Sequence, residues 1–322
     1  MDNKICIIGV YFGQLPNYFE LWLKSARANA EVDYLIVTDQ QLPMCAGNVK
    51  LLSMQLHEMK NLAINKLGIH NISLERPYKC CDFKPAYGII FQDYLHGYDY
   101  WGHCDFDMIF GDLSGFFEKY ELYSYDKFLA LGHLTMYRNT PEVAERYKAP
   151  GSKTDYKTVF TSDQSCYFDE LNCITRVYTV NGYSQFTKRI FCDIASIYKR
   201  YRDIEEYPLD EKAVNHKQQI YYWKDGHVYR KWYDSRNGEH TDEYIYIHFK
   251  KRPNFSIGFN HEGCQAFIIS NAGFFPLEGE PDLESVKKYN RYYPIRETCE
   301  TVRNHVTRVK SKAARMIKRR SD

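Results

Sequence analysis

The amino-acid sequence predicts one α/β domain, in which a Rossmann-like mixed sheet is flanked by helices, followed by a basic helical tail. The apolar segment 4–10 has the length and composition of a buried strand. Residues 18–29 then place apolar side chains on one helix face, and the apolar run 34–37 predicts a second buried strand. A strand, a helix and a strand form a βαβ unit. We therefore expect a parallel sheet with ligands beyond the carboxyl ends of its strands.

The composition of the 322-residue chain is that of a folded protein from a reducing compartment. Apolar residues make up 44% and charged residues 26%, which is typical of globular proteins and excludes a disordered or fibrous chain. The ten cysteines form no CxxC pair, which favours buried thiols over a disulfide framework or a zinc site. No signal-peptide pattern follows Met1, and no run of about 18 apolar residues is present. We therefore expect a cytoplasmic protein.

Aromatic residues are unusually frequent, at 16% of the chain, and 29 of them are tyrosines. Most are expected in the core and in strands. Tyrosine has an apolar ring and a polar tip, so the remainder are candidates for lining clefts where rings stack on sugars or bases.

Patterns further along the chain extend the α/β prediction. They indicate two helices at 53–68 and 82–97, strands at 127–131, 134–137 and 244–249, and a hairpin whose turn is Asp225-Gly226. The second half is therefore expected to be more antiparallel than the first. No GxGxxG segment follows the first strand, which disfavours a dinucleotide-binding fold.

An acidic pair, Asp105 and Asp107, follows an apolar strand-like segment. Carboxylates at this spacing can face one ligand, and hard divalent cations such as Mg²⁺ or Mn²⁺ prefer oxygen ligands and are shared with substrate diphosphates. Acidic pairs at this spacing also occur in exposed turns, where they cap the backbone and bind no ion. Here the neighbours are strongly apolar, and carboxylates in apolar surroundings need a partner or an ion.

These residues resemble GT-A-type bacterial glycosyltransferases of capsule, O-antigen and teichoic-acid gene clusters. The resemblance covers roughly residues 3–255. It rests on the βαβ start and on the segments Asp82–Gly88, Trp101–Asp112 with its DxD motif, Gly132–Asn139, Phe168–Glu170 and Tyr246–Arg252. It implies a GT-A-like domain over 1–295, with a nucleotide-sugar-binding half at 1–113 and an acceptor half at 114–295.

The resemblance implies a metal-dependent hexosyltransferase that uses a nucleotide-sugar, with UDP-sugars as the expected donors. Mn²⁺ or Mg²⁺ would be held by Asp105, Asp107 and His248, and Asp105 would also reach the donor. The donor's phosphates would meet Lys250, Lys251 or Arg252, because neighbouring cations stabilise a leaving diphosphate. The acceptor would be a surface polysaccharide or its lipid-linked precursor.

Other residues are assigned by the same resemblance. Five that follow the first two strands would frame the base and ribose: Tyr11, Phe12, Gly13, Thr38 and Asp39. Lys84 would touch the diphosphate or simply begin a helix, and His133 would lie beside the sugar or occupy a strand edge.

A general base for the acceptor hydroxyl is sought among Asp163, Asp169 and Glu170, which are otherwise solvated loop carboxylates. Many inverting enzymes of this type have a Glu-Asp order. Here the order at 169–170 is Asp-Glu, which leaves the choice of base and the stereochemistry open.

The tail, residues 296–322, is predicted to be a basic amphipathic helix. Residues 301–322 contain eight Lys or Arg and one Asp, with Val and other apolar residues at helical spacing. Such a helix can lie on an anionic membrane surface through residues 301–320, or remain a solvated terminus. No aromatic platform or recognised module supports nucleic-acid binding.

Two other functions fit parts of this pattern. A metal-dependent hydrolase such as a phosphodiesterase would use the same acidic pair but usually needs more ligands and two ions. A non-catalytic, membrane-associated sugar-binding scaffold would need no catalytic carboxylates.

Overall fold

The computed structural model describes residues 3–42, 47–195, 201–205, 212–236, 238–250, 255–260 and 263–290. Its main sheet has seven strands in the order β3-β2-β1-β4-β7-β6-β8. These strands are β1 Ile5–Tyr11, β2 Val32–Thr38, β3 Val49–Ser53, β4 Tyr100–Cys104, β6 Lys127–Leu131, β7 Leu134–Arg138 and β8 Gln185–Phe186. Strands β3, β2, β1 and β4 are mutually parallel, whereas β7 is antiparallel to β4 and β6. The mixed α/β sheet is thus as predicted.

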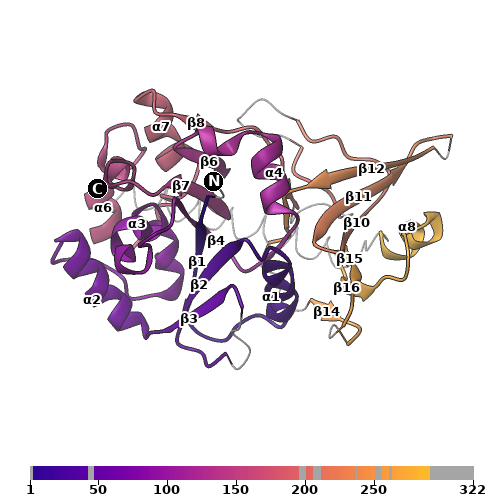
Figure 1. Cartoon of the computed structure of the whole chain (residues 1–322), viewed down its shortest axis with the longest axis horizontal. Helices are drawn as coiled ribbons and strands as arrows, with labels where there is room; N and C mark the ends of the chain where they lie inside the picture. Colours follow the sequence, from indigo (N-terminus) through magenta and orange to yellow (C-terminus); the bar gives the residue numbers. More distant parts are fainter. Residues whose placement is uncertain are drawn as a thin grey trace, which may run out of the picture.

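Helices cover both faces of this sheet (Figure 1). They are α1 Phe19–Ala28, α2 Leu56–Leu67, α3 Tyr87–Ile90, α4 Leu113–Lys119, α5 Pro141–Glu145, α6 Tyr156–Thr161 and α7 Arg176–Val180. Alternate side chains of β1 enter two separate cores, because successive strand residues point to opposite faces. Ile5 and Ile7 pack with α1 and α4, while Cys6 and Ile8 pack with α2, α3, α6 and α7.

The segment before α3 differs from the prediction. A 3₁₀ helix, η1, spans Pro77–Ala86, so the helical region begins before Asp82. Pro85 has no N–H to donate, which disfavours a continuous α-helix here. Further short helices are η2 Gln92–Tyr94, η3 Leu122–Ser124, η4 Arg146–Lys148 and the π-helix η5 Leu171–Thr175. The predicted helix at 53–68 begins at Leu56 and ends at Gly68, whose φ is +67°.

A second sheet has the order β12-β11-β10-β15-β16-β14. Its strands are β10 Gln218–Lys224, β11 His227–Tyr233, β12 Glu239–Tyr244, β14 Ser256–Ile257, β15 Ala266–Ser270 and β16 Gly273–Pro276, and α8 Leu283–Tyr289 follows. The hairpin at Asp225-Gly226 is confirmed, with φ of +49° and +91°. Leu21 of α1 and Tyr18, the residue before this helix, share a core with the second sheet. The Trp223 indole donates to the Phe110 carbonyl at 3.0 Å. The two sheets therefore belong to one packed domain (Figure 1).

A small third sheet, β5-β13-β9, joins the two halves. Its strands are β5 Met108–Phe110, β13 Tyr246–His248 and β9 Cys192–Asp193. The predicted strand 244–249 is interrupted at Ile245, where β12 ends and the chain passes into β13. His248 pairs with Met108 on one side and with Asp193 on the other. This pairing places Asp193, His248 and the strand that follows the acidic pair next to one another.

None of the described helices is long and apolar enough to cross a bilayer. The predicted tail, 296–322, and the domain boundary at 295 lie outside the described residues.

Lys127 is a fully buried lysine on β6 and provides a test of the core. Its ammonium donates to Thr175 Oγ1 at 3.1 Å and to the Leu129 carbonyl at 3.3 Å. Burial lowers its pKa from 10.5 to about 7. The unfolded chain therefore binds more protons between these values, and this group makes stability rise with pH across that window.

We expect Lys127→Met to stabilise the fold at about pH 6 by on the order of 1–3 kcal/mol, because a charge is no longer buried. Its advantage over wild type should shrink as pH rises from about 7 toward 10.5, as urea unfolding would show. Exposed Lys157 on α6 is the matched site, and Lys157→Met should give no pH-dependent difference. An equal effect of both substitutions would contradict the buried-charge interpretation.

Candidate functional site

The Asp105–Asp107 loop connects β4 to β5, and its backbone is held by three other segments. The Asp105 N–H donates to the His133 carbonyl at 2.9 Å, and the Trp22 indole donates to the Asp105 carbonyl at 3.1 Å. The Asp107 carbonyl accepts from the Phe249 N–H at 3.0 Å. The acidic pair is thus positioned by α1, the β6–β7 turn and the end of β13.

The structure brings Asp105 and Asp107 together with His248, and we call these three residues the metal-ligand group. One ligand atom from each lies within 4.8 Å of the others. His248 Nε2 is 3.5 Å from Asp107 Oδ1, and the Asp105 and Asp107 side chains keep 30% and 19% exposure, so solvent reaches them. Two carboxylate oxygens and one imidazole nitrogen fit Mn²⁺ or Mg²⁺, with the remaining positions left for water or a ligand's oxygens.

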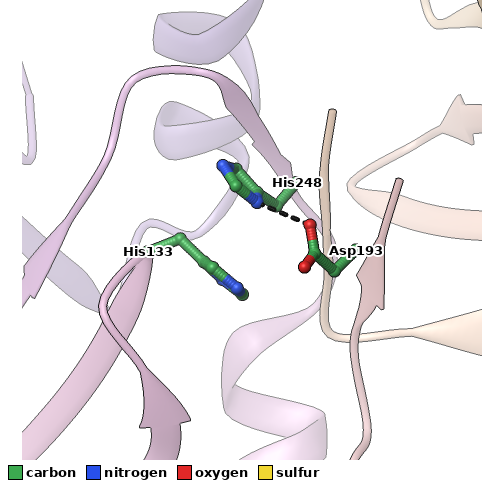
Figure 2. Close-up of side chains that lie close together, drawn as sticks. All are labelled: His133, Asp193 and His248. Atoms are coloured by element: carbon green, nitrogen blue, oxygen red, sulfur yellow. Dashed lines mark hydrogen bonds and ion pairs between the residues drawn. The ribbon is translucent and has the colours of Figure 1, made fainter. Parts of the chain in front are cut away.

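Asp193 orients the imidazole of His248, and sequence reasoning missed it. Its carboxylate accepts from His248 Nδ1 at 2.8 Å (Figure 2). Nε2 is therefore the nitrogen directed at Asp107. The Asp193 N–H donates to Asp203 Oδ1 at 2.9 Å, which fixes this residue in turn. A carboxylate behind a ligating histidine sets the tautomer and the ring direction. No motif marks Asp193, because strand β9 is only two residues long.

His133 packs flat against His248, with ring centroids 4.3 Å apart and planes 18° apart (Figure 2). His133, Asp193 and His248 also lie within ligand distance of one another. An imidazole lone pair lies in the ring plane, so two stacked rings do not converge on one ion, and the metal-ligand group is the better centre. Tyr246 hydroxyl bonds His133 Nδ1 at 2.8 Å, whereas buried Nε2 has no partner among the described residues.

The charges of these groups are strongly coupled. Burial alone would lower the pKa of His248, but the carboxylates of Asp107 and Asp193 raise it to about 10. Burial would raise the pKa of both carboxyls, and His248 instead holds each below its usual range. Burial and the nearby His248 charge lower the pKa of His133, which is neutral. Without a metal, His248 is therefore a cation at neutral pH.

A second cluster is built around the buried ammonium of Lys84. It donates to Asp105 Oδ1 at 2.7 Å, to Asp169 Oδ2 at 3.0 Å and to the Gly132 carbonyl at 2.7 Å. An ammonium has three donors, and all three are used. Lys84 thus links the acidic loop to Asp169, and a contact with a diphosphate, as predicted, would require one of these bonds to be exchanged.

Asp169 and Glu170, two of the predicted candidate bases, lie at this cluster. Gly132 is required by the close approach, because a Cβ there would lie 2.3 Å from Asp169 Oδ2. Burial raises the pKa of Asp169, and burial followed by the Asp169 charge raises the pKa of Glu170 to about 7. Glu170 is only partly buried. A carboxyl that titrates near neutrality is suited to accepting a proton.

The residues predicted to frame a base and ribose meet at the carboxyl ends of β1 and β2. Tyr11 and Thr38 are directly paired in the sheet, and the Gly13 N–H donates to Asp39 Oδ1 at 2.9 Å. Gly13 has a φ of +91°, which glycine adopts without strain. The Tyr11 ring packs edge-to-face against the Phe106 ring, with the ring centroids 5.5 Å apart. Phe106 is the residue between Asp105 and Asp107. Phe12 is buried in the core instead of facing this edge.

The remaining predicted residues are placed differently. Asp163 is exposed, and its carbonyl accepts from Arg76, so the bonds described for it do not lead to Lys84 or to the metal-ligand group. Lys250 Nζ lies 3.9 Å from Asp193 Oδ1. Lys251 and Arg252 lie outside the described residues.

The fold and site therefore define an α/β protein with a candidate divalent-metal centre beside buried carboxylates. The chain belongs to DUF6625, a family of unknown function whose model matches residues 7–278. No curated protein matches the sequence.

Two solved structures are similar to parts of the chain. One is mouse xyloside xylosyltransferase 1 in its apo form, with 8% identity and a TM-score of 0.36 over 59% of this chain and 87% of that chain. The other is the galactosyltransferase LgtC in complex with donor and acceptor sugar analogs, with 10% identity and a TM-score of 0.30 over 58% and 75%.

Metal binding to His248 requires loss of a proton, which gives a pH test. Because the pKa of His248 is about 10 without metal, the apparent affinity for Mn²⁺ should rise with pH, by up to about tenfold per unit between about pH 6 and pH 8. Calorimetry in buffers of different ionisation enthalpy should detect about one proton released per ion. His248→Asn should bind Mn²⁺ more weakly and release none. An affinity that does not change with pH in wild type would contradict His248 as a ligand.

Proposed function

We propose that the protein transfers a glycosyl unit from a nucleotide-sugar to an acceptor hydroxyl in a reaction that depends on a divalent metal. The observation that carries this proposal is the convergence of Asp105, Asp107 and His248 beside the buried carboxyl of Asp169 and the partly buried carboxyl of Glu170. The group follows β4, which is parallel to β1, at the sheet edge where α/β proteins bind ligands.

The metal-ligand group would hold Mn²⁺ or Mg²⁺. The ion would share the negative charge of the donor diphosphate and stabilise the leaving nucleoside diphosphate. On the protein side, Asp193 keeps Nε2 of His248 directed at the site, and Lys84 neutralises Asp105 from the core. Gly13, Thr38 and Asp39 lie at the neighbouring strand ends, where a ribose would be met.

Glu170 is the better candidate for the general base. Asp169 Oδ2 is already bonded by Lys84, whereas Glu170 is partly open and its pKa is about 7. Glu170 would take the proton of the acceptor hydroxyl. The hydroxyl oxygen then bonds the anomeric carbon as the bond between that carbon and the diphosphate breaks. Neutral His133, with its buried Nε2 beside His248, would bond a hydroxyl of the donor sugar.

The expected donor is a UDP-hexose, and the acceptor a surface polysaccharide or its lipid-linked precursor at the cytoplasmic face of the membrane. This part of the proposal is supported by the sequence resemblance and by the basic residues 301–320, which would hold the enzyme at anionic lipid. Lys250, Lys251 and Arg252 follow His248 and would meet the donor phosphates. A phosphodiesterase usually needs two metal ions. The two possible ligand groups in the described part of the chain both use His248, so they would not hold two ions side by side, which favours the transferase over the phosphodiesterase.

A thermal-shift screen tests donor binding. We expect one nucleoside diphosphate, UDP first, to raise the melting temperature only when Mn²⁺ is present, because ligands stabilise the state that binds them. Asp107→Asn should remove this shift and weaken Mn²⁺ binding by at least about 100-fold, more than loss of a second-shell contact usually costs. Asp93→Asn, an exposed carboxylate paired with Lys66, is the matched control and should behave as wild type. A metal-dependent shift that survives in Asp107→Asn would refute the assigned centre.

Glu170→Gln tests the base. It keeps the side-chain shape but cannot accept the proton, so acceptor-dependent transfer should fall by about 10²–10⁴-fold while binding of UDP and Mn²⁺ is retained. Wild-type transfer should rise as pH passes about 7, where Glu170 loses its proton, and the variant should lack this rise. Glu142→Gln on α5 is the exposed control. Undiminished transfer by Glu170→Gln would exclude Glu170 as the base.

A further inference from the structure

Two tyrosines on different segments expose most of their surface. Tyr78 is 62% exposed on η1, and Tyr167 is 58% exposed on the loop that precedes η5. Most aromatic side chains of the described residues are buried in the cores, so each of these rings would gain from a partner that covers it.

The two segments are joined by hydrogen bonds that start from an ion pair within η1, whose Lys79 ammonium donates to the Gln164 carbonyl at 2.7 Å. Lys79 Nζ and Asp82 Oδ2 are 2.7 Å apart, and both side chains are only 2% exposed. Asp82 accepts from the N–H groups of Cys166 and Phe168, the two neighbours of Tyr167. The loop is therefore bonded to η1 on both sides of Tyr167, while the Tyr167 ring itself remains outside.

The backbone of Tyr167 is strained. Its φ is +56°, in the left-handed region that bulky residues rarely occupy. Such strain persists only when surrounding bonds enforce it, and it is concentrated at functional sites. Here the hydrogen bonds that the Cys166 and Phe168 N–H groups donate to Asp82 enforce it. Within the described part of the chain the Tyr167 ring is more exposed than covered, and none of the hydrogen bonds involves its hydroxyl.

Tyr167 adjoins the candidate base, and Tyr78 lies on the helix that carries Lys84. The Tyr167 carbonyl accepts from the Glu170 N–H at 3.1 Å, so Tyr167 and the candidate base belong to one turn. Helix η1 carries Tyr78 at its start and Lys84, which contacts Asp105 and Asp169, near its end. Partial burial, and after it the nearby Cys81, Tyr167, Asp105 and Asp169, raise the pKa of Tyr78.

We propose that Tyr78 and Tyr167 form an aromatic platform on which a sugar ring of the acceptor glycan stacks. The apolar C–H face of a pyranose fits an aromatic ring, and the phenol hydroxyls can bond its rim. A sugar held there would have its hydroxyls beside Glu170. The inference rests on the proposed transfer reaction and names the residues that select its acceptor.

The probes are methyl glycosides of common hexoses and N-acetylhexosamines, measured by saturation-transfer difference NMR on the full-length protein with UDP and Mn²⁺. Wild type should bind at least one of them. Tyr78→Ala and Tyr167→Ala should weaken that binding by about tenfold or more, as expected when an aromatic anchor is truncated. Tyr→Phe at either position should weaken it by less than about threefold, because the ring remains. Tyr94→Ala, at an exposed tyrosine on η2, should have no effect.

Tyr167→Asn guards against loss of folding, because asparagine tolerates a positive φ. This variant should keep the wild-type melting temperature and its shift with UDP and Mn²⁺ but lose glycoside binding. Unchanged glycoside binding in the alanine variants, or no glycoside binding by wild type that binds UDP and Mn²⁺, would overturn the platform. Absence of any UDP and Mn²⁺ binding would instead overturn the proposed function. In that case, the effect of the tyrosine substitutions on glycoside binding would still test the platform.

Discussion

The site depends on one buried ammonium. Lys84 comes from η1 and binds the acidic loop through Asp105, the β6–β7 turn through the Gly132 carbonyl, and the following loop through Asp169. Burial would lower the pKa of Lys84, but Asp105 and Asp169 raise it well above its usual value, so it stays charged. Removing one partner of such a cluster leaves an uncompensated buried charge, which is strongly destabilising. Lys84 therefore fixes the positions of the acidic loop, the β6–β7 turn and the loop of Asp169 relative to one another.

The same 3₁₀ helix carries a second buried pair, Lys79 and Asp82, which fixes the loop bearing Tyr167. These two clusters explain the sequence pattern of η1. Seven of its ten residues are buried, but its apolar residues do not repeat at helical spacing. Its polar side chains point inward to other loops, and Pro85 prevents a regular α-helix. The helix-start signals at Asp82 and Pro85 consequently placed the start of this helical region too late, because η1 begins at Pro77.

Local patterns sufficed for the parts of the fold that local forces determine. The βαβ start, the hairpin at Asp225-Gly226 and the acidic pair Asp105/Asp107 were all readable, because strand length, turn chemistry and apolar context are local properties. Asp193 was not readable: its role arises from pairing of β9 with β13, two very short strands brought together by the tertiary fold. The exposure of Tyr167 likewise depends on bonds to Asp82, far away in the sequence.

The distribution of cations explains how a carboxylate-rich site can be stable both with and without a metal. Lys84, 6% exposed, neutralises Asp105 from the core side, while the 30% exposure of Asp105 leaves its other side open to solvent. Next to Asp105, protonated His248 is itself buried and pairs with Asp107, which keeps 19% exposure, and with buried Asp193. A divalent ion would displace that proton and take over the neutralising role, because ligation requires the neutral imidazole. The fold thus supplies a permanent cation, Lys84, on the core side of the acidic loop, and a replaceable one, His248, beside the proposed metal position.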